Sequence, residues 1–239
     1  MLSEIITEEQ FGFLNNRQIH DVVSLEQEID HTIKKEKQRA FSLKLDLSKA
    51  YERVGWTFVR LLLIKIGVAL EVVEWIMGCL QSTSFSVIIN GSLSNFFKST
   101  RGIRQGCPLS PFIFLLVAEA LSKIIHKAKA KGAIKGIKVF ATKEVTHTLF
   151  VDDALLFGEG FIRNLESFLA LIDKYKRATG MVVNMEKSNL IHNEFPEDMI
   201  QRTRELIQYQ TTPIGEGFKY LGFTLKPNCY SFQDWVWLY

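Results

Sequence analysis

TLFVDDALLF, residues 148–157, is the stretch from which the fold and function of this chain are best approached. Two adjacent aspartates, Asp152 and Asp153, interrupt an apolar run of residues that favour β-strands. A polar pair in the middle of such a run predicts a hairpin with both carboxylates at the bend. Buried charge is costly unless it is paired or binds a metal, so the pair indicates a divalent-cation site. An exposed turn is the alternative, because Asp is also a common turn residue.

The composition is that of an ordinary globular protein with one or two domains. The chain has 239 residues, 47% of them hydrophobic and 23% charged, and a formal net charge of +3, which neither demands nor excludes a nucleic-acid partner. Three cysteines without close Cys or His neighbours indicate neither a zinc site nor a disulfide framework. The N-terminus lacks a signal-peptide layout, and charges interrupt the most apolar segment, residues 56–73, so we expect a soluble intracellular protein of the nucleus or cytoplasm.

Hydrophobic periodicity predicts helices and strands along the whole chain. The predicted helices cover residues 18–37, 56–66, 70–80, 109–125, 162–178 and 195–208. Strands are predicted at 41–47, 85–90, 95–100 and 217–225, with a strand, turn and strand at 181–191. The last residues, 233–239, resemble the beginning of a further helix.

A third acid stands out in FSLKLDL, residues 41–47, where apolar and polar side chains alternate. The alternation places Asp46 on the non-core face near the end of a strand, where it can reach a cleft. A surface charge is the alternative for this residue. His126 and His147 have no partner at ligand spacing, so we interpret both as ordinary structural or surface residues.

Carboxylates that converge from different elements are what two-metal phosphoryl transfer requires. The motifs around these acids, in their order, resemble the reverse transcriptase domain of non-long-terminal-repeat (LINE-type) retrotransposons, in versions like those of plant genomes. The motifs are QFGFLNNRQIHD (10–21), LDLSKAYERV (45–54), RGIRQGCPLSP (101–111), FVDD (150–153), GMVVNMEKS (180–188) and FKYLGF (218–223). Val151 departs from the family pattern, in which Ala is usual.

The resemblance implies an α+β fold, a polymerase palm whose antiparallel sheet is backed by helices. Residues 1–40 would form a partial fingers segment, residues 41–225 the palm with inserted finger elements, and residues 226–239 a truncated start of the thumb. The basic segment that precedes the finger motif in the family is not found, and most of the thumb is expected to be absent.

The resemblance also implies a role for individual residues. Asp46 and Asp152 would be the main ligands of Mg²⁺, or alternatively Mn²⁺, with Asp153 assisting. Tyr51 would exclude the nucleotide 2′-hydroxyl, although a core tyrosine is the alternative. Further residues would contact the nucleotide or the template and primer: Gln105, Gly106 and Lys187 for the first, and Arg17, Arg101 and a primer grip of Tyr220, Leu221 and Gly222 for the second. Lys187 could serve as general acid or be a plain surface lysine.

The function implied is RNA-directed DNA polymerase activity, a nucleotidyl transfer with an RNA template, a DNA primer and deoxynucleoside triphosphates as partners and no membrane. One alternative is a catalytically silent fragment derived from a retrotransposon, which at most binds nucleic acid. A relative of group II intron maturases is another, although it would need an additional domain after the thumb.

Overall fold

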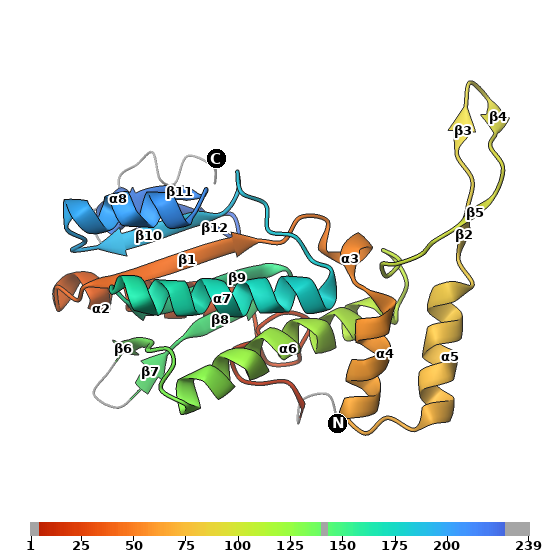
Figure 1. Cartoon of the computed structure of the whole chain (residues 1–239), viewed down its shortest axis with the longest axis horizontal. Coiled ribbons are helices and arrows are strands. Elements are labelled where there is room, and N and C mark those ends of the chain that lie inside the picture. Colours follow the sequence, from red (N-terminus) through yellow and green to blue (C-terminus); the bar gives the residue numbers. More distant parts are fainter. Residues whose placement is uncertain (1–4, 140–142, 228–239) are drawn as a thin grey trace.

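The structure, a computed structural model, describes residues 5–139 and 143–227 and is built on one five-stranded sheet (Figure 1). The strand order is β11 (Gln210–Pro213), β10 (Asn189–Asn193), β1 (Ala40–Asp46), β9 (Asp153–Glu159) and β8 (His147–Phe150). Only the β10–β11 pair is parallel, and the other three pairs are antiparallel. Strand β1 therefore lies at the centre, between two strands that come much later in the chain.

Helices cover both faces of this sheet. Helix α2 (Ile19–Lys35) packs on one face together with the small β12–β13 hairpin, Phe218–Tyr220 and Phe223–Leu225. Helices α6 (Ser110–Ala130) and α7 (Ile162–Thr179) pack on the other, as Figure 1 shows. The remaining elements lie around this body: α3 (Ala50–Arg53), α4 (Trp56–Lys65), α5 (Leu70–Gln81), β6 (Ile137–Val139), β7 (Lys143–Val145), α8 (Glu197–Leu206) and the 3₁₀ helix η1 (Ile214–Glu216).

Glycines at two positions correctly predicted the end of a helix and a tight turn between two strands. Helix α7 stops at Gly180, which has a left-handed φ of 81° and donates its N–H to Lys176 O at 2.9 Å. Asn90 and Gly91, both with positive φ, form the two-residue turn between β3 (Ile88–Ile89) and β4 (Ser92–Leu93). With β2 (Ser84–Phe85) and β5 (Phe97–Lys98) below it, this hairpin stands out from the body of the molecule (Figure 1).

The expectation of a polar, non-core face on β1 agrees with the partial exposure of Lys44 and Asp46, but it is wrong for Ser42. Leu43 and Leu45 do pack toward α6 and α7, but Ser42 on the opposite face is also buried, with 1% of its surface exposed. Helix α2 and the β12–β13 hairpin form a second apolar cluster there. Asp46 remains partly exposed because it is the last residue of the strand, at the edge of that cover.

Two further expectations need correction, and one cannot be compared. Residues 181–188 form a loop held by an isolated bridge from Val183 to Leu47, so only β10 remains of the predicted strand pair. Residues 217–225 do not form one strand, because Leu221 and Gly222 turn with positive φ and fold the segment into the β12–β13 hairpin. The predicted helix start at 233–239 lies outside the described residues. No helix among the described residues is long and apolar enough to cross a membrane.

Candidate active site

The β8–β9 hairpin brings the three aspartates to one end of the sheet. Phe150 pairs with Asp153, so only Val151 and Asp152 form the loop between the two strands. On the other side of β9, Asp46 lies directly opposite Asp153. Residues paired in this way share a face of the sheet, so these two carboxylates are neighbours and Asp152 adjoins them. The bend thus holds one of the two acids in the FVDD motif, and the other begins a strand.

The three carboxylates influence one another electrostatically. Burial raises the pKa of Asp153 to about 6, and the charges of Asp152 and Asp46 also raise it, while Lys44 and Lys187 oppose the shift. The pKa of Asp152 is likewise raised, mainly by burial and further by the charge of Asp46. A divalent cation among these oxygens would offset both the burial cost and the repulsion. The donor set therefore fits Mg²⁺, which prefers one or two carboxylates together with phosphate oxygens.

The turn that carries Asp152 is strained and is held by the N-terminal segment. Val151 has a φ of 57°, a backbone conformation that β-branched residues rarely adopt. The fully buried Gln10 accepts two hydrogen bonds at Oε1, from the N–H of Gly12 at 2.9 Å and from that of Val151 at 3.3 Å. Backbone hydrogen bonds also join residues 9 and 11 to Leu149 of β8. Gln10 and Gly12 thus support the turn, a role that no local sequence pattern indicated.

Gly12→Ala should displace this turn and, with it, the carboxylate of Asp152. An added Cβ would lie 2.5 Å from Val151 Cγ2 and 2.8 Å from its backbone nitrogen, and the second atom cannot move without the turn. A shift of about 1 Å in a catalytic group costs on the order of 100-fold in rate, so we expect a 10- to 100-fold loss of the primer extension that the family resemblance implies. Gly78→Ala in α5, where nothing lies within 4 Å of the added atom, is the matched control. Full activity of Gly12→Ala would show that the turn tolerates the shift.

Tyr51 lies in α3, next to the aspartates. Its ring stacks on Phe114 of α6, with centroids 4.7 Å apart and planes within 6°. Burial raises the pKa of its hydroxyl, and the charge of Asp152 raises it further, which places the two side chains close together. A flat, partly exposed ring therefore lies beside the carboxylates, and its exclusion of the nucleotide 2′-hydroxyl stays a prediction.

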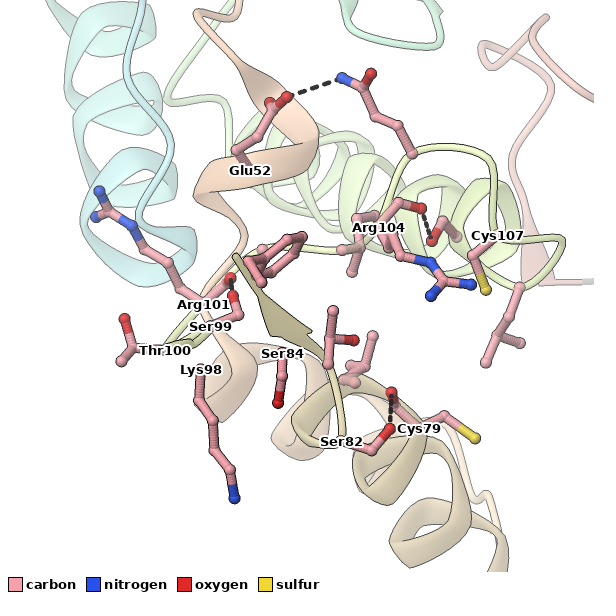
Figure 2. A pocket seen from close by; sticks show the side chains of 18 of the residues that line it. Glu52, Cys79, Ser82, Ser84, Lys98, Ser99, Thr100, Arg101, Arg104 and Cys107 are labelled. Atoms are coloured by element: carbon pink, nitrogen blue, oxygen red, sulfur yellow. Dashed lines mark hydrogen bonds between the residues drawn. The ribbon is translucent and has the colours of Figure 1, made fainter. Parts of the chain in front are cut away.

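The loop that opens α6 packs against α3 and lines an open cleft of about 1000 Å³ (Figure 2). Gly102, with a φ of 86°, lies so close to the Glu52 backbone that an added Cβ would be 2.7 Å from its carbonyl oxygen. Gln105 donates from Nε2 to Glu52 Oε1 at 2.8 Å. The cleft is lined by the basic side chains of Lys98, Arg101 and Arg104 but by none of the three aspartates. It therefore adjoins the acidic site without containing it.

The structure brings some of the other predicted residues to the site and leaves others apart from it. Lys187 is close enough that its charge acts on Asp152 and Asp153. Gly106 has a φ of 78° and open space around its Cα, and Arg101 is exposed on the cleft. Their proposed contacts with nucleotide and template stay predictions.

Two of the predicted nucleic-acid contacts have other roles in the structure. The Arg17 guanidinium donates to the carbonyl oxygens of Thr7 at 2.6 Å and Gln10 at 2.5 Å, so it braces the N-terminal segment. The Tyr220 side chain is fully buried, and only the turn of Leu221 and Gly222 is left for a primer to contact. Whether this hairpin grips a primer stays a prediction.

The sequence profile of the family described as "Reverse transcriptase (RNA-dependent DNA polymerase)" matches residues 1–225. The chain belongs to the reverse transcriptase family. This match confirms the resemblance that the sequence motifs indicated. The three clustered aspartates are therefore candidates for the family's catalytic acids.

The relatives of this reverse transcriptase chain include proteins of mobile elements. A Pol polyprotein from the type-1 retrotransposable element R2 of Popillia japonica is 25% identical over 217 residues, which are 85% of this chain and 30% of that protein. The "Transposon TX1 uncharacterized 149 kDa protein" of Xenopus laevis is 26% identical over 231 residues, 96% of this chain and 17% of that protein. A mitochondrial protein of Arabidopsis thaliana is 42% identical over 67 residues, 28% of this chain and 55% of that protein. The chain thus spans only part of the length of these relatives.

Solved structures with the same fold include telomerases. The telomerase of Candida albicans superimposes with a TM-score of 0.59 at 13% identity, over 87% of this chain and 33% of that one. Telomerase from Candida tropicalis gives 0.59 at 14% identity, over 92% and 33%. At such low identity the likeness concerns the fold alone, and it confirms the predicted palm: a mainly antiparallel sheet backed by helices.

Proposed function

We propose that this chain is the catalytic core of an RNA-directed DNA polymerase that extends a DNA primer along an RNA template. The observation that carries the proposal is the register that sets Asp46 opposite Asp153, with Asp152 in the adjoining turn. These residues would hold two Mg²⁺ ions, or Mn²⁺, which when bound activate the primer 3′-hydroxyl and neutralise charge on the leaving pyrophosphate.

The residues around the carboxylates support the same reaction. Lys187, whose charge reaches two of the aspartates, would contact the triphosphate and could protonate the leaving pyrophosphate. The basic side chains of the neighbouring cleft, Arg101 and Arg104 among them, would contact template phosphates. Tyr51, fixed by its stacking on Phe114, would lie beneath the sugar of the incoming nucleotide.

Primer extension by the purified chain tests the proposal. A labelled DNA primer annealed to RNA should be lengthened with Mg²⁺ present and remain unchanged when the ion is chelated. The same reaction on a DNA template reports the template preference. Salt-dependent binding of the primed template without any extension, in Mg²⁺ and in Mn²⁺, would contradict the proposal and favour a catalytically silent fragment instead.

Tyr51→Ala should weaken discrimination against ribonucleotides. Steric exclusion of one added group by an apolar pocket is worth on the order of 10- to 100-fold. We therefore expect the ratio of kcat/KM for deoxynucleotide over ribonucleotide to fall by that factor, whereas Tyr51→Phe, which keeps the ring, should leave it unchanged. The ratio is measured by single-nucleotide incorporation. An unchanged ratio in Tyr51→Ala would remove this residue from the sugar contact.

A further inference from the structure

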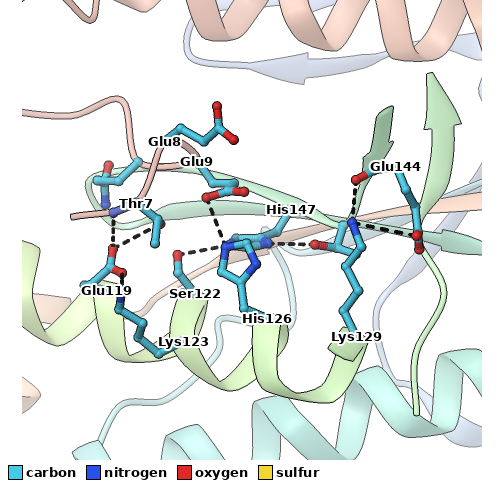
Figure 3. A network of polar contacts seen from close by, with 12 residues as sticks. Thr7, Glu8, Glu9, Glu119, Ser122, Lys123, His126, Lys129, Glu144 and His147 are labelled. Atoms are coloured by element: carbon cyan, nitrogen blue, oxygen red, sulfur yellow. Dashed lines mark hydrogen bonds and ion pairs between the residues drawn. The ribbon is translucent and has the colours of Figure 1, made fainter. Parts of the chain in front are cut away.

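A second group of metal-ligating side chains lies on the sheet face opposite the aspartates (Figure 3). His147 of β8 points to α6, where its Nε2 lies 2.9 Å from Ser122 Oγ. The next residue, Thr148, points to the other face and donates to Glu26 Oε1 at 2.6 Å. Because Asp153 shares its face with Thr148, the sheet separates His147 from the catalytic acids.

Three side chains meet in this group from distant parts of the chain. Glu9 Oε2 lies 3.1 Å from His126 Nε2, and the rings of His126 and His147 are 5.3 Å apart at 72°. One ligand atom from each of the three residues lies within 4.8 Å of the other two. Ligands in a tetrahedral zinc site, with bonds of about 2.0–2.1 Å, are about 3.3 Å from one another, so small side-chain rotations would complete the geometry.

The surroundings prepare His147 to act as a ligand. Its Nδ1 is held by Thr146 Oγ1 at 3.0 Å, which fixes the ring and leaves Nε2 facing Ser122 and His126 on α6. Glu9 and His126 are only partly buried, so water can reach a fourth coordination position.

We propose that Glu9, His126 and His147 form a Zn²⁺ site, distinct from the Mg²⁺ site expected at the aspartates. Two imidazoles with one carboxylate are a ligand set that zinc accepts, whereas Mg²⁺ prefers oxygen ligands throughout. A bound ion would tie the N-terminal segment to α6 and β8. Since Glu9 precedes Gln10, which supports the Val151 turn, the ion would also stabilise the catalytic hairpin from the opposite side of the sheet.

Zinc binding by the tag-free chain tests the site without reference to polymerase activity. We expect one Zn²⁺ per chain by calorimetry in the presence of excess Mg²⁺, and a higher melting temperature when ZnCl₂ is added. Substitution of residues around metal ligands already costs 10- to 100-fold in affinity, so His126→Asn and Glu9→Gln should each weaken binding at least ~100-fold. Both residues are partly exposed, so both variants should fold, unlike variants of the buried His147.

Matched controls separate this site from other zinc-binding groups. His20→Asn changes an exposed histidine of α2, and Cys107→Ser removes a free thiol; both should bind zinc as tightly as the wild type. Asp152→Asn should also keep full affinity, because the aspartates belong to the other site. Equal zinc affinity in the wild type, His126→Asn and Glu9→Gln would overturn the proposal, as would the lack of stoichiometric binding by the wild type.

Discussion

Asp152→Asn is expected to abolish primer extension while leaving the fold intact. The amide has nearly the shape of the carboxylate, so the two-residue turn at Val151 and Asp152 can be kept. It lacks the charge that would hold a divalent cation next to Asp46 and Asp153. The stabilisation that metal ions supply amounts to several kcal/mol, so incorporation should fall by at least ~10³-fold, equivalent to about 4 kcal/mol.

Two measurements decide whether such a loss is catalytic. Binding of a labelled RNA–DNA duplex should be nearly unchanged in the variant, and its melting temperature should be equal or higher, because one of the mutually repelling acids is gone. Asp198→Asn, an exposed aspartate of α8, is the matched control and should retain full activity. If Asp152→Asn incorporated nucleotides as fast as the wild type, the aspartates would not be the polymerase site.

Asp30→Asn is expected to stabilise the protein at neutral and alkaline pH. Asp30 of α2 is 1% exposed, and neither carboxylate oxygen has a hydrogen-bond partner among the described residues. Burial raises its pKa from 3.8 to about 7. Between these values the folded chain keeps the proton and the unfolded chain has lost it, so the free energy of unfolding falls as the pH rises. Over the whole interval the loss is about 4 kcal/mol.

Urea unfolding at several pH values measures this effect. The variant and the wild type should be similarly stable near pH 4, and the variant should be more stable by about 4 kcal/mol at pH 8. Glu28→Gln, an exposed acid on the same helix, should follow the wild-type curve. Burial also raises the pKa of Glu26, and the charge of Asp30 raises it further, so Glu26 adds a dependence of the same sign that is smaller in Asp30→Asn than in the wild type. Parallel curves for the wild type and Asp30→Asn would mean that Asp30 is ionised in the folded chain.

Local features of the sequence correctly predicted much of the secondary structure. The alternation around Leu43 and Leu45 gave β1, the Asn90-Gly91 pair gave a turn, and Gly180 gave the end of α7. Each of these depends on the conformational preferences of a few consecutive residues, which do not need the rest of the fold. The order of the motifs was sufficient to indicate the family and the three aspartates.

Contacts between distant residues could not be predicted in this way. Ser42, on the polar-looking face of β1, is buried because α2 and the β12–β13 hairpin pack on that face, and no pattern within β1 reports that cover. Gln10 supports the turn at Val151 across 141 residues of sequence. Glu9 meets His126 across 117 residues, so two histidines without nearby ligands in the sequence become part of a candidate metal site.

By itself, therefore, the sequence determined the family, the principal strands and helices and the identity of the acidic residues, since these follow from short-range periodicity and motifs. Only the tertiary structure decided which residues hold the Asp152 turn, how the second face of the sheet is buried and where Glu9, His126 and His147 converge. The physical reason is that side-chain burial, pKa shifts and ligand geometry arise from packing between segments far apart in the chain.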